Sequence, residues 1–287
     1  TVFREMARGQ HFGKRVLDFR AEDLLVGVPQ DPPTRFRDDR TYLVAGGHSG
    51  FGFATARWLA AQGARHLALL SRSGPRDESV RAGIADLVAA GVSVYDLRAD
   101  LTEAAAVSGA LDSLRASAPP IAGVIHAAMV LEDRFLTEHD AASFGRALDP
   151  KTLGAWHLHE ATLGDPIELF FVYSSIAAAI GSPRQSNYAA GNTFLEGLVR
   201  YRRAIGRPGL AIEWGALSGS GYVERNEATF AFLEKTGSHA LPVDVALTRL
   251  AEILDRDTDG IAVAKIDWAI LGRYSPTLAK SPVYREL

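Results

Sequence analysis

The sequence predicts an α/β fold with a doubly wound parallel sheet of seven strands. Short aliphatic runs alternate with longer amphipathic stretches over residues 39–287, which is the order of elements in a βαβ series. Several of these runs are apolar at consecutive positions, as in strands that helices cover on both faces. Each gap between runs is long enough for a right-handed crossover helix, so consecutive strands can be parallel.

The individual elements follow from these patterns in chain order. The expected strands cover residues 41–45, 66–70, 92–96, 122–127, 168–173, 210–213 and 261–265. The expected helices cover residues 51–62, 77–90, 103–116, 138–162, 185–205 and 243–254. Ahead of them, the prolines and the charge run at 28–40 predict an extended surface linker, because proline lacks the backbone donor. We place the start of the folded domain near Asp39.

The composition is that of an ordinary globular protein and excludes several functions. A net charge of −3 lacks the basic excess typical of nucleic-acid-binding domains. The chain has no cysteine, which excludes disulfides and thiolate metal sites, and no HExxH or comparable spacing predicts another metal site. No apolar run approaches the ~18 residues of a membrane span, and the start, TVFREMARGQ, has no signal-peptide core. We expect a cytoplasmic location and, because residue 1 is not methionine, a piece of a longer polypeptide.

A glycine-rich turn joins the first expected strand to the first helix. It consists of Gly46, Gly47, His48, Ser49, Gly50, Phe51 and Gly52. Glycines at such a turn let the backbone approach a pyrophosphate, and the N–H groups at the helix N-terminus favour its charge. A plain strand-to-helix turn is the alternative, which the position at the start of a βαβ series disfavours. The turn predicts a dinucleotide site.

The end of the second strand bears on the choice of dinucleotide. An acidic residue at this position suits a free ribose 2′-hydroxyl, whereas arginine suits a 2′-phosphate. The chain has Ser71 and Arg72 here and no carboxylate, so NADPH is favoured over NADH; an ordinary surface arginine is the alternative. After the third strand, Asp100 and Leu101 are placed to contact the adenine, and helix capping by Asp100 is an equally good explanation.

Four side chains are candidates for a reacting centre. Ser175 ends the fifth strand, Tyr188 opens a helix thirteen residues later, and Asn192 follows one turn on. A serine hydroxyl and a tyrosine phenol beside a nicotinamide suggest carbonyl reduction, in which the phenol donates a proton and the hydroxyl binds the same oxygen. A nearby cation would lower the phenol pKa, and Lys151 is the candidate. Taken alone, Tyr188 would be an ordinary packed tyrosine and Lys151 a solvated charge.

Six sequence motifs resemble the ketoreductase domain of reducing polyketide synthases and animal-type fatty acid synthases. They are AGGHSGFG, SRSGP, VIHAA, DPKTLGAWHLHE, VYSSIAAAIGSPRQSNYAAGNTFLEGL and AIEWGAL. The resemblance covers roughly 39–287 and implies a Rossmann fold of the short-chain dehydrogenase/reductase type. It implies NADPH as the cofactor and reduction of the 3-oxo group of an acyl chain. That chain would be held on the phosphopantetheine arm of an acyl carrier protein domain.

The resemblance also assigns roles to residues. Tyr188 becomes the proton donor and Ser175 the partner of the oxyanion. Lys151 and Asn192 become the residues that tune Tyr188 and relay its proton. A generic short-chain dehydrogenase carries its lysine four residues after the tyrosine, where this chain has Asn192. In the ketoreductase subgroup lysine and asparagine exchange places, and Lys151 stands where that subgroup has its lysine. The cofactor site implied by the motifs further includes His126, Ala127 and Ala128.

Substrate contacts and stereochemistry have weaker sequence signals. The family's B-type ketoreductases, which yield the 3R-hydroxy product, carry Leu-Asp-Asp where this chain has Leu131, Glu132 and Asp133. A-type enzymes carry tryptophan where this chain has Ile180, so B-type is favoured although Glu132 departs from the motif. Trp214, in the AIEWGAL motif, is expected to contact the substrate together with Glu132 and Asp133.

A glycine-flanked segment at about 218–242 has an amphipathic middle and predicts a lid over the nicotinamide and the thioester. We expect its hinges near Gly219 and Gly221. A segment that merely closes the core is the alternative.

Residues 1–38 carry a second resemblance. MARGQHFGKRVL above all looks like the closing segment of an enoylreductase domain, as in fully reducing synthases of the mycocerosic-acid type. The segment has no cofactor loop of its own, so we expect no second activity; a docking arm is the alternative. The expected partners are therefore an enoylreductase domain and a structural ketoreductase-like subdomain upstream in the same polypeptide. We expect the chain alone to be less stable than the intact module.

Two other functions stay open at this point. A stand-alone short-chain dehydrogenase acting on a free ketone or alcohol is disfavoured by the exchange of lysine and asparagine and by the missing initiator methionine. A non-catalytic structural ketoreductase-like subdomain is disfavoured because the glycine turn and Tyr188 are both intact.

Overall fold

The computed structural model describes residues 35–219, 227–256 and 258–281. Residues 34–287 form one compact unit. The expected enoylreductase-like segment and the expected hinge at Gly221 lie outside the described residues.

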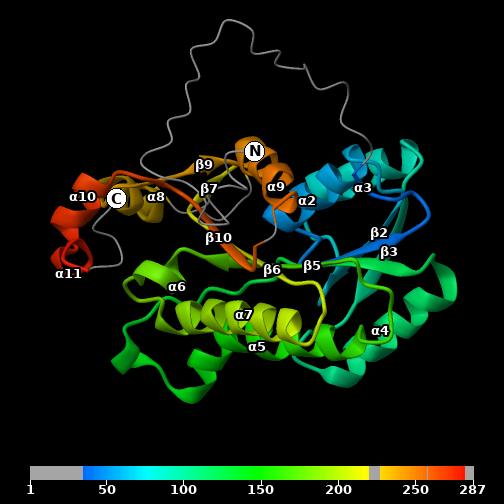
Figure 1. Cartoon of the computed structure of the whole chain (residues 1–287), viewed down its shortest axis with the longest axis horizontal. Helices are drawn as coiled ribbons and strands as arrows, with labels where there is room; N and C mark the ends of the chain where they lie inside the picture. Colours follow the sequence, from blue (N-terminus) through cyan, green and yellow to red (C-terminus); the bar gives the residue numbers. More distant parts are fainter. Residues whose placement is uncertain (1–34, 220–226, 257, 282–287) are drawn as a thin grey trace, which may run out of the picture. The chain divides into compact units, whose positions relative to one another are not determined.

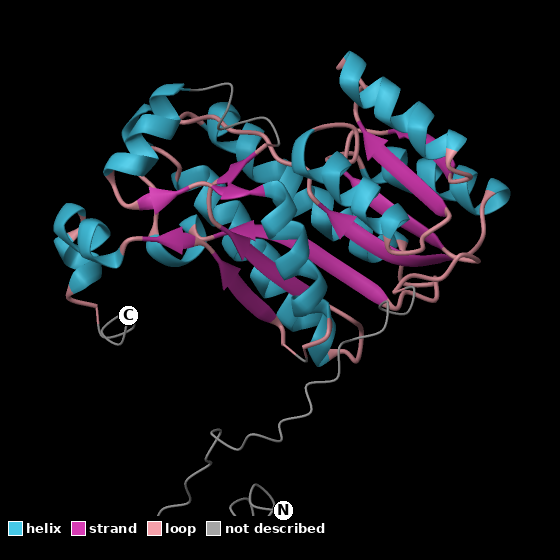
Figure 2. Cartoon of the chain, turned by 90° about the horizontal axis from the view of Figure 1, so that it is seen from above, coloured by secondary structure: helices cyan, strands magenta, loops and turns pink. Residues whose placement is uncertain are grey.

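A seven-stranded parallel sheet forms the middle of the domain, and its strands twist across it (Figures 1 and 2). The spatial order is β10-β6-β5-β4-β1-β2-β3. In chain order the strands are β1 (Thr41–Ala45), β2 (His66–Ser71), β3 (Ser93–Arg98), β4 (Ile121–His126), β5 (Leu169–Ser175), β6 (Leu210–Trp214) and β10 (Gly260–Val263). The strand order reverses between β1 and β4, as in a Rossmann-type doubly wound sheet. The predicted fold class is confirmed, and each expected strand is present within two residues.

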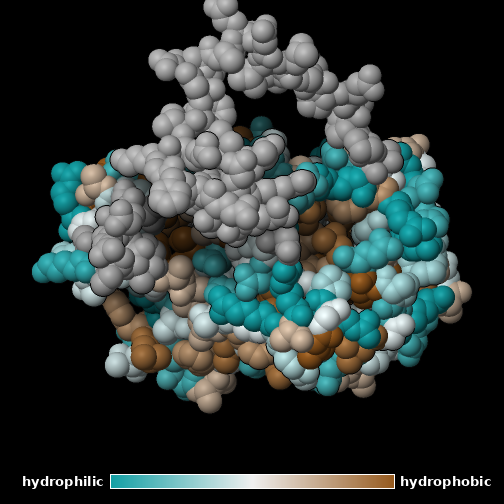
Figure 3. Space-filling view, in the orientation of Figure 1, coloured by the Kyte–Doolittle hydropathy of each residue, from teal (hydrophilic) through white to brown (hydrophobic). Residues whose placement is uncertain are grey.

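Helices cover both faces of the sheet (Figure 1). One layer contains α2 (Gly50–Ala61), α3 (Glu78–Ala89) and α9 (Val243–Leu254). The other contains α4 (Ala104–Ser117), α5 (Ala141–Ala161) and α7 (Ser186–Ala204). All six expected helices are therefore present. Hydrophobic residues gather at the outer surface over α5 and α7, where Phe194 and Tyr201 are exposed (Figure 3).

The two layers create two hydrophobic cores, one on each side of the sheet. Every residue of β1 and of β4 is buried, because these central strands have helices on both faces. Val44 faces the core beneath α2, α3 and α9, whereas its neighbour Leu43 faces the core beneath α4, α5 and α7. This alternation along a strand is the reason that its sequence is apolar at consecutive positions.

The remaining elements are short and lie near the carboxyl end of the sheet. They are η1 (Leu136–Glu138), α6 (Ala177–Ile180), β7 (Leu217–Ser218), α8 (Glu227–Lys235), β8 (Ser238–His239), β9 (Leu241–Pro242), β11 (Lys265–Ile266), α10 (Trp268–Tyr274) and α11 (Pro276–Ala279). Strand β7 pairs with β9 in parallel, and β8 pairs with β11 antiparallel. Much of the segment expected to act as a lid thus forms α8, β8 and β9.

The residues just before β1 belong to the folded unit. Phe36 is buried, and its ring makes edge-on contacts with Tyr42 and Trp58 at centroid distances of 5.1 and 5.4 Å. The packing therefore begins a few residues ahead of Asp39, where we expected the boundary. Through the described part of the chain, no helix combines the length and the apolar character that crossing a membrane requires.

Candidate active site

A cavity of about 1480 Å³ lies at the carboxyl ends of the parallel strands. Its walls come from the turn after β1, the ends of β2 and β3, the loop after β4, the end of β5, the start of α7, and the segment around α8 and β11. In doubly wound sheets the crevice at the point of strand reversal is the usual ligand site. The glycine turn and the reacting centre predicted from sequence therefore share one cavity.

The glycine turn is shaped for a ligand that lies against the backbone. Gly46 has a φ of +85°, and a Cβ there would come 2.7 Å from the backbone nitrogen of Ala128. A Cβ on Gly52 would overlap the carbonyl of Gly46. Because α2 begins at Gly50, its free N–H groups open toward this turn. Gly46, Gly50 and Gly52 also line the cavity, so its wall at this turn is bare backbone, which fits a pyrophosphate. Gly47 instead packs inward against Val44, away from the cavity.

His48 braces the turn as a neutral side chain. It is 3% exposed, and its Nδ1 lies 2.7 Å from the Ser71 hydroxyl, which also accepts a hydrogen bond from the Gly74 N–H. Its Nε2 lies 3.2 Å from Asp96 without hydrogen-bonding geometry. Burial lowers the pKa of His48, and Asp96 opposes that shift only in part. His48 and Ser71 thus tie the turn to the end of β2.

Arg72 projects from the end of β2 with 73% of its side chain exposed. It lies 3.7 Å from Asp100, whose carboxylate accepts hydrogen bonds from the backbone N–H and the hydroxyl of Thr102. These bonds hold the pKa of Asp100 below its usual range. Helix α4 begins at Ala104 with Glu103 in the capping position, so Asp100 forms a turn before the helix rather than its cap. Asp100 and Leu101 both line the cavity.

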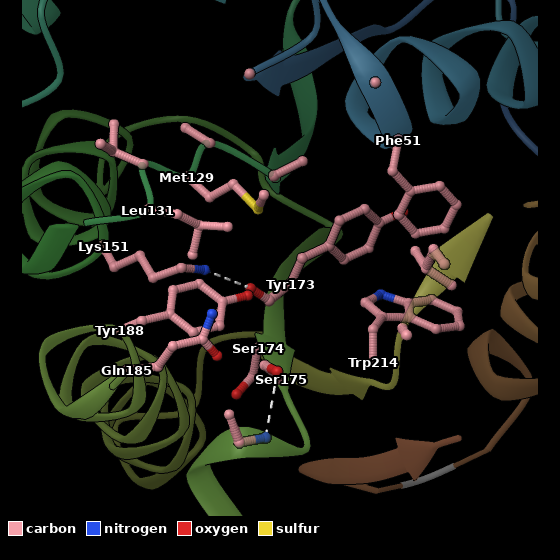
Figure 4. A pocket seen from close by; sticks show the side chains of 18 of the residues that line it. Phe51, Met129, Leu131, Lys151, Tyr173, Ser174, Ser175, Gln185, Tyr188 and Trp214 are labelled. Atoms are coloured by element: carbon pink, nitrogen blue, oxygen red, sulfur yellow. Dashed lines mark hydrogen bonds between the residues drawn. The ribbon is translucent and has the colours of Figure 1, made fainter. Parts of the chain in front are cut away.

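The reacting groups meet from three separate elements (Figure 4). Lys151 on α5 donates a hydrogen bond from Nζ to the carbonyl of Tyr173 at 3.0 Å. The same Nζ lies 5.2 Å from the ring centroid of Tyr188, which is in the first turn of α7. Ser175 ends β5 and lines the cavity beside Tyr188. The structure thus brings together the ammonium, the hydroxyl and the phenol expected from sequence.

Burial dominates the electrostatics of this centre. Lys151 is 1% exposed, and its desolvation lowers its pKa to about 7. Desolvation also raises the pKa of the Tyr188 phenol, while the side chains of Ser175 and Asn192 oppose that shift. A lysine that titrates near neutrality can both hold and release a proton under ordinary conditions. The arrangement suits proton transfer next to a carbonyl.

Besides Gly47, three more predicted site residues lie behind or beside the cavity rather than on its wall. Asn192 donates from Nδ2 to the Tyr188 carbonyl at 2.9 Å, and its Oδ1 is buried without a partner in the described structure. His126 is fully buried, donates to the Pro150 carbonyl at 2.9 Å, and has its pKa lowered by burial to about 4. Glu132 forms ion pairs with Arg134 and Arg146 on the outside of the loop after β4.

The other expected substrate residues do line the cavity. Asp133 accepts hydrogen bonds from Gln185 at 3.2 Å, which joins the loop after β4 to the start of α7. Trp214 ends β6 and packs edge-on against Phe51 and Tyr173 at 5.2 and 5.7 Å. Phe51 in turn stacks on Tyr173 at 4.9 Å. These aromatic rings form the wall beside the glycine turn (Figure 4).

Sequence reasoning missed two residues that shape the site. The carbonyl of Tyr173 accepts the Lys151 hydrogen bond, and Gln185 holds Asp133. Tyr173 gives no sequence signal, because its backbone carbonyl and not its side chain accepts the hydrogen bond. Gln185 stands three residues before Tyr188, one helical turn away, and that spacing could have drawn attention to it.

Comparison with known proteins places the chain in a family. The family model for the KR domain matches residues 40–219. The chain belongs to the KR domain family. This ketoreductase domain is 40% identical to "Reducing polyketide synthase PKS1" of Cochliobolus heterostrophus over 88% of the chain. It is 33% identical to a phenolphthiocerol/phthiocerol polyketide synthase of Mycobacterium tuberculosis over the whole chain. The match covers 10% and 13% of those relatives, so the chain spans about a tenth of their length.

Solved structures give the same assignment. The ketoreductase of the first module of phoslactomycin biosynthesis from Streptomyces sp. HK803 matches with a TM-score of 0.80 and 32% identity, over 86% of this chain and 57% of that one. A structure of A-type ketoreductases from a modular polyketide synthase matches with a TM-score of 0.78 and 31% identity, over 90% of this chain and 53% of that one. The expected resemblance is confirmed: the chain is a polyketide synthase ketoreductase domain with the short-chain dehydrogenase/reductase fold. That fold implies a nicotinamide cofactor, which the glycine turn fits.

Proposed function

We propose that this ketoreductase domain uses NADPH to reduce the 3-oxo group of an acyl thioester on a carrier protein domain, giving the 3-hydroxyacyl thioester. One observation carries the proposal: Lys151, Ser175 and Tyr188 converge in the cavity that also contains the glycine turn. A nicotinamide nucleotide supplies a hydride to a carbonyl carbon when it is bound. The residues around it must then manage the charge on the carbonyl oxygen.

The side chains have distinct roles in that task. Tyr188 donates its phenolic proton to the carbonyl oxygen as negative charge develops there, and Ser175 donates a hydrogen bond to the same oxygen. Lys151 in its charged form, 5.2 Å from the phenol ring, stabilises the phenolate that remains. Asn192 holds the carbonyl of Tyr188 and so fixes the first turn of α7. His126 positions α5 through Pro150, next to Lys151.

The preference for NADPH rests on the end of β2. Arg72 is a cation at that strand end, and its guanidinium is 73% exposed, which suits a 2′-phosphate. Asp100 accepts from Thr102 through one carboxylate oxygen and pairs with Arg72 through the other at 3.7 Å, so a 2′-phosphate would compete with Asp100 for the guanidinium. The remaining cofactor residues proposed from sequence, Ser49, Gly50, Phe51, Leu101, Ala127 and Ala128, all line the same cavity.

The stereochemistry and the context are part of the proposal. Asp133 faces the cavity and is held by Gln185, which supports the B-type outcome with a 3R-hydroxy product. Chiral chromatography of the product tests this, and a 3S product overturns it. We further propose that the domain works in the cytoplasm. It would act beside an enoylreductase domain and a structural ketoreductase-like subdomain of one multienzyme.

The decisive experiment is Tyr188→Phe assayed with trans-1-decalone and NADPH. Removing the phenol oxygen abolishes proton donation and leaves the dinucleotide cleft intact, so turnover should fall by about 10²–10⁴-fold. NADPH affinity, measured by fluorescence enhancement, should change little. The matched control is Tyr201→Phe, a tyrosine on α7 that is 47% exposed and outside the cavity. Turnover of Tyr188→Phe within a fewfold of the parent chain would overturn the proposal.

A further inference from the structure

A strained arginine stands at the mouth of the cavity. Arg184 has a φ of +64°, and it is the one non-glycine residue of the described chain in the left-handed region. L side chains rarely adopt this conformation, and such outliers tend to persist at functional sites. Arg184 precedes α7 in a loop whose residues 181–185 all line the cavity. The backbone geometry thus places an exposed guanidinium on the cavity wall.

The guanidinium has unused capacity to bind an anion. It lies over the exposed ring of Phe135 at 5.4 Å and donates one hydrogen bond, to the Asp133 carbonyl at 3.3 Å. Through residues 35–219, 227–256 and 258–281, no carboxylate forms an ion pair with it. An arginine offers five N–H donors in a planar fork that matches a phosphate. For most of those donors, the described structure shows no hydrogen-bond partner.

The surroundings favour an anion rather than a cation. Lys265 on β11 lines the cavity from the opposite side and is likewise exposed and without an ion pair in the described structure. Of the acidic side chains nearby, Glu234 bonds to His239 at 2.8 Å, and Asp133 accepts from the uncharged amide of Gln185. Arg184 and Lys265 thus give this cavity wall two cations without an ion pair in the described structure, against the one carboxylate of Asp133.

This anion site cannot be that of the cofactor's 2′-phosphate. Arg72 follows β2, whereas Arg184 belongs to the connection after β5, and β1 and β4 lie between those strands in the sheet. The ends of β2 and β5 are therefore three strand spacings apart, about 14 Å. An anion beside Arg184 would then belong to the other ligand of this cavity, which for the proposed function is the acyl thioester substrate.

We propose that Arg184 is a specificity-determining residue that binds the phosphate of a phosphopantetheine arm. The inference rests on the proposed function, because that function supplies a substrate with such an arm. The arm can be free phosphopantetheine or can be attached to a carrier domain, and both present the same phosphate chemistry. Arg184 then selects phosphorylated thioester arms over uncharged ones without taking part in the chemical step.

The test compares phosphopantetheine with pantetheine, which differ only in the phosphate. Calorimetry on the 287-residue chain, saturated with NADP⁺ to fill the dinucleotide site, should show phosphopantetheine binding about fivefold more tightly, the size of an exposed ion pair. Arg184→Gln should abolish that preference, and salt should weaken it in the parent chain. The 3-oxoacyl thioesters of the two arms should show the same ratio in KM with kcat unchanged. The thioester on the carrier domain should show the same dependence of KM on Arg184 as the thioester of the phosphorylated arm.

Two further variants make the test decisive. Arg146→Gln removes the same charge from the neighbouring surface outside the cavity, and it should leave the preference intact. Arg184→Gly accepts the left-handed backbone without strain, so it should abolish the preference even if Arg184→Gln folds poorly. Equal binding of the two arms to the parent chain, or equal loss of both in Arg184→Gly, overturns the inference. A phosphate preference that depends on Arg184, without any reduction of the thioesters, would instead overturn the proposed function alone.

Discussion

Replacing Lys151 with methionine removes a charge that the fold buries, and this change predicts a specific pH dependence of stability. Burial lowers the pKa of Lys151 from 10.5 to about 7. Above pH 7 the native chain therefore releases the proton, whereas the unfolded chain keeps it up to its higher pKa. The unfolding free energy gained from this group rises with pH by at most about 1.4 kcal/mol per unit. Between pH 7 and pH 9 the parent chain should gain about 2 kcal/mol over Lys151→Met.

Urea denaturation followed by circular dichroism at pH 7 and pH 9 measures this gain, with the slope m checked for each variant. The matched control is Lys280→Met, a lysine at an exposed position of the C-terminal segment. Its unfolding free energy relative to the parent chain should be the same at both pH values. If the difference in unfolding free energy between the parent chain and Lys151→Met is also the same at pH 7 and pH 9, Lys151 is not a buried group that loses its proton near neutrality.

Four other outcomes follow from the structure. The kcat for reduction should fall as pH rises above about 7, because Lys151 loses the charge that stabilises the phenolate; a flat profile to pH 9 would contradict this. Arg72→Glu should raise the KM for NADPH by about 10–100-fold and change that for NADH much less, as steady-state kinetics will show. Gly52→Val should abolish NADPH fluorescence enhancement, since its side chain would overlap the Gly46 carbonyl; undiminished binding would refute the assigned turn. Adding the upstream structural subdomain should raise the melting temperature of the chain, and equal temperatures would refute the expected partnership.

The fold was largely predictable because its signals are local. Apolar runs, helix periodicity and gap lengths specify elements without knowledge of their neighbours, and the structure places all seven strands and six helices accordingly. Burial of Lys151 was partly predictable too. It stands four residues after Ala147 and four before Ala155, and both alanines are fully buried on the same face of α5.

The placement of other site residues was not predictable. His126 and Ala127 are adjacent in the motif, yet the first is buried under α5 and the second lines the cavity. Glu132 and Asp133 are also neighbours, and only Asp133 faces the cavity. Successive side chains leave the backbone in different directions, and a motif does not say which direction meets solvent, a helix or a ligand.

By itself the sequence determined the order of strands and helices, the glycine turn, the family and the types of side chain available for chemistry. The tertiary structure alone decided that Lys151, Ser175 and Tyr188 share one cavity, how completely Lys151 is desolvated, and that Arg184 lines the same cavity. The physical reason is that patterns of apolar residues act over a few positions of the chain. Distances and desolvation between distant segments arise only when α5, β5 and α7 pack together.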